Sequence, residues 1–191
     1  MYKKTVCGIM LTLLFVGIFS LTISIKPAKA EPKTIVVPDD YLTIQEAINN
    51  ARGGDTVYVR SGTYSEDVIT VNKSISLIGE DKYTTILQPV EIFERTVLNI
   101  VSDNVTIKNF TIRYGVFGIS MLYSNNTRIV NNIIQGNIAI LSVNSDNSII
   151  RDNVISGADG IRLRSSYCKI INNTVTSCSS TGLFIYGGRY N

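Results

Sequence analysis

The chain has 191 residues, of which 45% are hydrophobic and 17% are charged, and this length fits one domain with a short appendage. The composition is too apolar and too weakly charged for a disordered chain. Over most of its length it is too polar for a protein with several membrane spans. The sequence contains no His, so the commonest metal ligand and the commonest general base are both missing.

The first thirty residues predict an export signal. Two lysines precede an apolar run over residues 6–25, and Ala28 and Ala30 follow it. A basic start, an apolar middle and an Ala-x-Ala end are typical of a secretory signal peptide, here with cleavage after Ala30. A retained membrane anchor is the alternative, because the run is long enough to span a bilayer. We therefore expect a signal peptide at 1–30, one β-helix domain at 31–191, and a secreted or cell-surface location.

The net positive charge of the chain, +3, belongs to the export signal. Residues 1–30 contain four Lys and no acidic residue, and the remainder carries 14 basic and 15 acidic side chains, a net charge of −1. A weakly acidic chain lacks the basic surface that binds nucleic acid. We expect no nucleic-acid partner, and membrane contact only through the N-terminal segment.

A short amphipathic helix is expected at about residues 43–52. Thr43 followed by Glu46 is a capping-box pattern, and Gly53 and Gly54 are expected to end the helix. The apolar positions follow helical spacing and are Ile44, Ala47, Ile48 and Ala51. The open end of a repeat stack exposes its core, so we expect this helix to cover the first turn.

A repeat of about 21 residues fills the second half of the chain. The first column of apolar pairs recurs at steps of 22, 21 and 20, as Ile107/Ile112, Ile129/Ile134, Ile150/Ile155 and Ile170/Val175. A second column, in which each member opens a short alternating strand, is Gly118-Ile119, Ala139-Ile140, Gly160-Ile161 and Gly182-Leu183. Three short β-branched strands per period predict a stack of parallel strands. The expected fold is all-β, a right-handed parallel β-helix with a short N-terminal capping helix.

Asn and Asp residues separate the first and second strands of each repeat. They form the columns Asn109, Asn131, Asp152, Asn172 and Asn132, Asn153, Asn173. Asn tolerates the left-handed conformation that a tight bend needs, and stacked amides can bond from rung to rung. We interpret both columns as structural.

The N-terminal part resembles the pectin-lyase-like β-helix proteins. The residues that carry this resemblance are Val37-Pro38-Asp39-Asp40-Tyr41, Thr43-Ile44-Gln45-Glu46-Ala47-Ile48, Gly54-Asp55-Thr56-Val57-Tyr58-Val59 and Gly62-Thr63-Tyr64. They are similar to the opening of pectin methylesterases, and closer to exported NosD-like or surface-layer-like β-helix repeat proteins. Over about residues 34–187 the resemblance implies the fold but no single activity, since lyases, esterases, epimerases and non-enzymes share it.

The resemblance implies that ligands lie on the outer face of the longest strand column. Strand alternation places the following residues inside: Leu98, Ile100, Ile119, Met121, Ile140, Ile161, Leu163, Leu183 and Ile185. The candidate binding residues outside, hereafter the outer strip, are Leu141, Arg162, Arg164, Phe184 and Tyr186. Rings stack on sugars and Arg pairs with carboxylates, so acidic polysaccharide or another cell-surface protein would suit the strip. Alternatively, further rungs, a loop or a subunit cover it.

No catalytic residue can be assigned from the sequence. A glycosidase needs two carboxylates beside one bond, and the outer strip contains neither Asp nor Glu. The acidic calcium cluster of pectate lyases and the paired Asp of pectin methylesterases, which the resemblance would imply, cannot be mapped here. Asp103, Asp146 and Asp159 are expected to be isolated in bends.

No metal site or cofactor is expected either. The NosD-like resemblance implies copper delivery, and copper needs a cluster of soft ligands. Beyond residue 30 the only thiols are Cys168 and Cys178. Their positions in neighbouring strands place them too far apart for a disulfide.

Two further features concern the surface and the end of the chain. Asn104 and Asn125 lie in Asn-x-Thr sequons and are the candidate glycosylation sites. The last residues, 184–191, lie in or just after a strand with no capping helix. An uncapped rung exposes strand edges, so we expect further rungs or a subunit there, or a truncated chain.

Three functions remain open from the sequence. The first is an exported, non-catalytic surface or adhesive module that binds acidic polysaccharide. The second is the N-terminal part of a polysaccharide-active lyase, esterase or hydrolase whose catalytic rungs are absent. The third is a NosD-like accessory protein for metal delivery.

Overall fold

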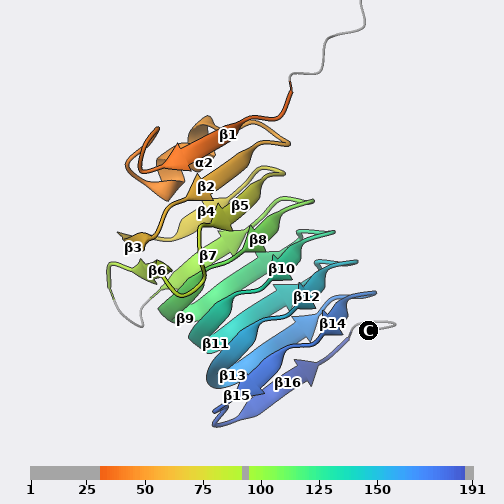
Figure 1. Cartoon of the computed structure of the whole chain (residues 1–191). Helices are drawn as coiled ribbons and strands as arrows, with labels where there is room; N and C mark the ends of the chain where they lie inside the picture. The colour runs from red at the N-terminus through yellow and green to blue at the C-terminus, as the bar shows by residue number, and fades with distance from the viewer. Residues whose placement is uncertain (1–30, 92–94, 188–191) are drawn as a thin grey trace, which may run out of the picture. The chain divides into compact units, whose positions relative to one another are not determined.

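Figure 1 shows the computed structural model, which describes residues 31–91 and 95–187. The expected signal peptide at 1–30 lies outside the described residues. The elements in chain order are β1 (Thr34–Val37), α2 (Ile44–Asn50), β2 (Thr56–Val59), β3 (Gly62–Glu66), β4 (Ile69–Val71), β5 (Ser76–Gly79), β6 (Thr85–Pro89), β7 (Thr96–Ile100), β8 (Thr106–Lys108), β9 (Thr111–Leu122), β10 (Arg128–Val130), β11 (Ile133–Val143), β12 (Ile149–Arg151), β13 (Val154–Arg164), β14 (Lys169–Ile171), β15 (Thr174–Thr176) and β16 (Thr181–Ile185). Over these described ranges, no helix is long and apolar enough to cross a membrane.

The strands stack in parallel as successive turns of one solenoid (Figure 1). One sheet has the order β1-β2-β5-β8-β10-β12-β14. The other has the order β15-β13-β11-β9-β6-β3, with β16 beside β13 and β7 between β4 and β9. Each turn therefore pairs its backbone groups with the turns before and after it, which confirms the predicted parallel β-helix.

The register predicted from the repeat is confirmed. Ile140 lies beside Ile119 on one side and Ile161 on the other, and Ile161 lies beside Leu183. Leu98 pairs with Ile119 one turn earlier. From Leu98 to Ile161 this column is buried, with at most 1% of each residue exposed. These side chains form a continuous apolar core because each one contacts its counterpart one turn away.

Two of the three expected strands per repeat run together in the regular turns. In β9, β11 and β13 the chain continues from the Asn bend through the Gly–Ile column as one long, bent strand. The glycines of this bend permit close contact between turns: a Cβ on Gly157 would lie 2.0 Å from the carbonyl oxygen of Gly136. The Gly–Ile column therefore lies within a strand and does not open one.

The N-terminal helix is present and slightly shorter than expected. Helix α2 spans Ile44–Asn50, and the Thr43 side chain accepts a hydrogen bond from the Glu46 backbone N–H at 3.2 Å. Ala51 is already extended, so the helix ends before Gly53 and Gly54 are reached. Its apolar residues are buried, and the helix packs against β1, β2 and β4, as its capping role requires.

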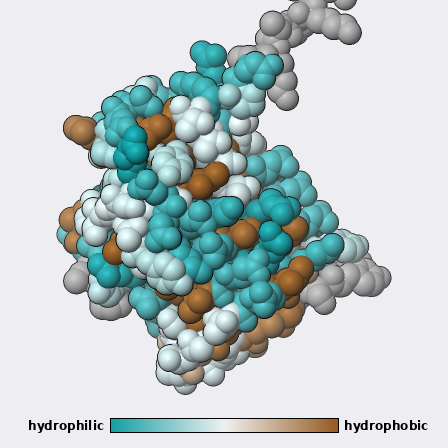
Figure 2. All heavy atoms as spheres, viewed as in Figure 1, coloured by the Kyte–Doolittle hydropathy of each residue, from teal (hydrophilic) through white to brown (hydrophobic). Residues whose placement is uncertain are grey.

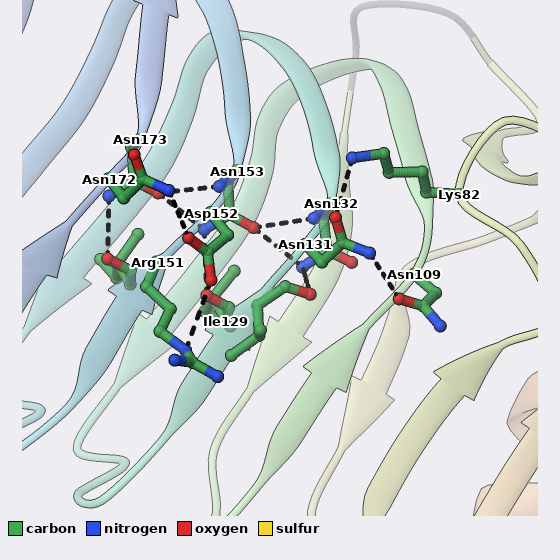
Figure 3. A network of polar contacts seen from close by, with 12 residues as sticks. Lys82, Asn109, Ile129, Asn131, Asn132, Arg151, Asp152, Asn153, Asn172 and Asn173 are labelled. Carbon is green, nitrogen blue, oxygen red and sulfur yellow. Dashed lines mark hydrogen bonds and ion pairs between the residues drawn. The ribbon is translucent and has the colours of Figure 1, made fainter.

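The bends between the two sheets have the geometry expected for Asn and Asp. Asn109, Asn131, Asp152 and Asn172 adopt left-handed φ angles between 51° and 63°. In the next column the Asn132 amide donates to Asn153 Oδ1 at 3.1 Å, and Asn153 donates to Asn173 Oδ1 at 2.9 Å (Figure 3). These amides bond along the stack, which confirms their structural role.

The last described turn differs from the prediction. Leu183 and Ile185 were expected inside, but they are 45% and 46% exposed. They occupy the correct alternate positions of β16, whose partner is β13. Their exposure follows because no described strand packs beyond β16, and a solenoid residue is buried only by neighbours on both sides.

Candidate functional site

The outer strip crosses three neighbouring turns. Leu141 of β11 lies beside Arg162 of β13, which lies beside Phe184 of β16. The backbone N–H of Tyr186 donates to the Leu163 carbonyl oxygen at 2.9 Å, and so the parallel register continues past the end of β16. The structure therefore brings these predicted residues together on one face.

Arg162 has a partner that the sequence analysis did not foresee. Its guanidinium donates to Asp159 Oδ2 at 2.5 Å, and the Asp159 side chain is only 7% exposed. The other carboxylate oxygen accepts from the backbone N–H of Thr181 at 3.1 Å. Asp159 is therefore not isolated, contrary to expectation, and its negative charge faces the Arg162 fork that we had considered for a ligand carboxylate.

The remaining part of the strip combines one cation with two rings. Arg164 is exposed and makes no salt bridge with any described residue. The Phe184 and Tyr186 rings lie 5.2 Å apart at an angle of 38° and are 47% and 36% exposed. Figure 2 shows apolar residues gathered at the end of the stack that carries β16. Aromatic surface and a free positive charge thus occur together at this end.

The other two acidic residues considered for catalysis accept hydrogen bonds from backbone N–H groups. Asp103 Oδ1 accepts from the Asn125 N–H at 2.6 Å, and Asp146 Oδ1 accepts from the Ser166 N–H at 2.7 Å. Asn125 Oδ1 in turn accepts from the Asp146 N–H at 2.8 Å. These side chains bond from turn to turn, so Asp103 and Asp146 are also not isolated.

The two candidate glycosylation sites lie in this same bend on neighbouring turns. Asn104 is exposed and has a left-handed φ of 57°. Asn125 is half-buried, and its side-chain oxygen is already engaged by the next turn. Asn104 therefore offers the more accessible side chain.

Cys168 is buried and Cys178 is partly exposed, and no disulfide joins them. Burial raises the pKa of the Cys168 thiol, and the negative charge of Asp146 raises it further. In the described part of the chain, no group of three or more Cys, Asp or Glu side chains is placed to hold a metal ion.

A groove that the sequence analysis missed lies on the outer side of the long bent strands. It has a volume of about 570 Å³ and is lined by Tyr114, Val116, Gln135, Gly136, Asn137, Ser156, Gly157, Ala158 and Ser177. We refer to it as the bend groove. The signal that could have revealed it is the glycine at 115, 136 and 157, because glycines recurring at the repeat spacing mark a shared bend.

Comparison with known proteins places these features in a family context. A protein-family model described as "Periplasmic copper-binding protein (NosD)" matches residues 48–191. A protein described as a cell surface glycoprotein from Methanothermus fervidus is 32% identical over 126 residues. That match covers 65% of this chain and 21% of the relative, so the chain spans about a fifth of the relative's length.

Solved structures with the same architecture include enzymes. A pectin methylesterase from Aspergillus niger superposes with a TM-score of 0.57 at 18% identity, over 78% of this chain and 59% of the enzyme. An alginate lyase from Paenibacillus sp. str. FPU-7 superposes with a TM-score of 0.60 at 15% identity, over 82% of this chain and 65% of the lyase. At these identities the likeness shows the shared β-helix fold alone.

Proposed function

The chain belongs to the NosD family of β-helix proteins, and from this premise we propose that it acts outside the cytoplasm as a non-catalytic surface module that binds acidic polysaccharide. An extracytoplasmic location is supported by the periplasmic description of the family and by the similarity to a cell surface glycoprotein. The basic and apolar residues at the start of the sequence agree with export.

The observation that carries the binding proposal is the juxtaposition of Arg164 with the Phe184–Tyr186 ring pair. Phe184 and Tyr186 are 47% and 36% exposed, and Arg164 has no acidic partner among the described residues. A uronate unit offers an apolar ring face and a carboxylate, which match these two features. Arg162 adds positive charge less effectively, because Asp159 neutralises it.

Binding is tested by affinity electrophoresis of the full chain in gels containing polygalacturonate or neutral dextran. We expect retardation by polygalacturonate that weakens as salt is added, because an exposed ion pair is screened. Arg164→Ala and Tyr186→Ala should each weaken binding several-fold, from about 1 kcal/mol per contact. The matched control is Arg128→Ala, since Arg128 is also exposed and has no ion pair among the described residues. Equal migration of wild type and Arg164→Ala would contradict the proposal.

The non-catalytic part has its own test. We expect no turnover of pectin, polygalacturonate or alginate by the full chain. The carboxylates of Asp103, Asp146 and Asp159 bond to backbone N–H groups, and Asp159 also to Arg162. These hydrogen bonds hold the stack together. They account for the three carboxylates without a role in proton transfer. Turnover that disappears in Asp146→Asn or Asp159→Asn would show that the protein is an enzyme.

Copper delivery is the second candidate, favoured by the family description alone. The donor set does not fit a copper ion. Met121 is fully buried in the core, Cys168 is buried against the bend, and the sequence has no His. Copper sites combine several soft ligands around one ion, and the described residues do not bring such ligands together. We therefore derive no copper chemistry for this chain.

A further inference from the structure

We propose that the bend groove is a second binding site, separate from the outer strip, and that it binds an uncharged oligosaccharide along the axis of the stack. The groove is lined from β9, β11 and β13, with Ser177 following β15. Its occupant therefore runs across successive strands, at about 4.8 Å per turn. A volume of about 570 Å³ falls within the range of small-ligand sites.

The first argument is that the polar side chains of the groove are unused. Gln135, Asn137, Ser156 and Ser177 line it, and none of their side chains makes a hydrogen bond to another described residue. The bend between the two sheets is different, because the side-chain amides of Asn132 and Asn153 donate hydrogen bonds to the neighbouring turns. Amides and hydroxyls that the fold does not use remain available to a ligand.

The second argument is the absence of charge. None of the groove-lining residues is acidic or basic. The nearest cation along β9, Arg113, donates to Gln88 Oε1 and lies 4.7 Å from the centroid of the Tyr114 ring. No lining side chain offers a charged ligand an opposite charge in exchange for its lost hydration. The chemistry favours a neutral ligand.

Peptides and purely apolar ligands fit less well. A peptide that binds by strand addition needs a free sheet edge, but β9, β11 and β13 are each paired on both sides. A purely apolar ligand would cover Gln135, Asn137 and Ser156 and leave their polar atoms without partners. A ligand that carries many hydroxyl groups satisfies these amides and hydroxyls as both donor and acceptor. A neutral oligosaccharide has this chemistry.

The shape of the groove depends on the glycines of the bend. A Cβ on Gly136 would lie 2.9 Å from the Gly118 backbone nitrogen and 3.0 Å from the Ile138 carbonyl oxygen. Side chains are therefore excluded at this position, and backbone lines the floor of the groove. Tyr114, with a left-handed φ of 67°, forms the wall at the β9 side. The ligand would lie over this backbone, between apolar side chains such as Val116 and polar side chains such as Gln135.

Isothermal titration of the full chain with cellohexaose, mannohexaose and chitohexaose tests this site. We expect at least one of them to bind with a millimolar or better dissociation constant that does not change with salt. The double variant Gln135→Ala/Asn137→Ala should weaken binding roughly tenfold or more, from two lost hydrogen bonds. Both residues are exposed, so circular dichroism should show an unchanged fold.

The matched control is Asn72→Ala, because Asn72 is an exposed amide outside the groove with no hydrogen bond of its side chain to a described residue. Its affinity should equal that of wild type. If none of the three hexaoses binds, or if the double variant binds as well as wild type, the groove is not a saccharide site. Arg164→Ala should leave hexaose binding unchanged while it weakens polygalacturonate binding. The two sites can therefore fail independently.

Discussion

The first and last turns of the stack bury their apolar side chains to different extents. At the first turn, Ile35 and Val37 of β1, against which helix α2 packs, are at most 2% exposed. At the last described turn, Leu183 and Ile185 hold equivalent inward positions but are nearly half exposed. Both pairs alternate correctly along their strands. The comparison shows that strand alternation selects the face of a side chain, whereas burial requires a neighbour above and below.

The edge strands at the two ends of the stack also differ in how their backbone groups are bonded. The N-terminal edge strand β1 is engaged by its own chain: Asp40 accepts from the Val36 N–H at 2.7 Å and donates its N–H to the Val36 carbonyl at 2.7 Å. In the described part of the chain, β14, β15 and β16 each pair on one side only. An unpaired edge is a surface on which another strand can add. We therefore expect the two ends to respond unequally to matched substitutions.

The largest contrast is expected for a charge placed in the same core column. Ile140→Asp should prevent folding, because an unpaired buried carboxylate costs several kcal/mol and Ile140 is fully buried. Leu183→Asp should change the free energy of unfolding by no more than about 0.5 kcal/mol, as at other exposed positions. Circular dichroism without denaturant detects the loss of fold in Ile140→Asp, and urea denaturation followed by circular dichroism measures Leu183→Asp. Similar destabilisation by the two substitutions would mean that the last turn is covered in solution.

The amide ladder gives the next largest contrast. Asn153 has neighbours on both sides: its Oδ1 accepts from Asn132, and its Nδ2 donates to Asn173 and to the Ile129 carbonyl. Asn153→Ala should lower the free energy of unfolding by about 3 kcal/mol, since several buried polar groups lose partners. Asn173→Ala, at the last turn, should cost about half as much. Equal losses in denaturant titrations would show that the ladder does not act cooperatively.

Acidification should act on the capped end through Asp55. The backbone N–H groups of Lys33 and Arg52 donate to its carboxylate and hold its pKa below the ordinary value. A lowered folded-state pKa adds stability above the unfolded pKa of about 3.9, and this stability is lost as the pH falls through the folded-state pKa. Asp55→Asn should cost about 1–3 kcal/mol near neutral pH by losing one acceptor.

The same variant should flatten the acid dependence. We expect the difference in unfolding free energy between wild type and Asp55→Asn to shrink as the pH falls from roughly 6 to roughly 2. Parallel pH profiles of the two proteins would show that Asp55 does not link the capped end to acid stability.

The smallest effect is expected at the helix cap. Thr43 accepts from the Glu46 N–H at the start of α2, and Thr43→Ala should cost about 1 kcal/mol. Thr43→Ser keeps the hydroxyl and should remain close to wild type. Thermal unfolding of both variants gives the comparison. A loss in Thr43→Ser as large as that in Thr43→Ala would show that the hydroxyl is not the stabilising group.

Much of the fold could be predicted from the sequence because its determinants recur at a fixed spacing. Ile119, Ile140 and Ile161 pair as the repeat predicted, and Asn109 and Asn131 occupy the left-handed bends. Each position repeats every 20 to 22 residues, so one alignment of the sequence with itself reveals which residues contact across turns. The helix cap followed from local chemistry in the same way.

The candidate sites were less predictable. The sequence placed Arg162 on the correct face, but its ion pair with Asp159 depends on side-chain positions three residues apart within a bend. The bend groove forms because two strands that were predicted as separate are one bent strand. A pattern of apolar residues does not distinguish two short strands from one bent strand. The grooved surface arises from backbone curvature, for which only the recurring glycines gave a signal.

The sequence by itself determined the period, the inward column and the bend residues, because each of these is a local preference repeated along the chain. The tertiary structure alone decided which of those residues are covered and which polar groups are left unused. Leu183 and Ile161 share one pattern but differ in exposure, and Asn137 and Asn153 are both amides but differ in their partners. The reason is physical: burial and hydrogen bonding are properties of contacts between turns, and the last turn and the outer bend lack some of those contacts.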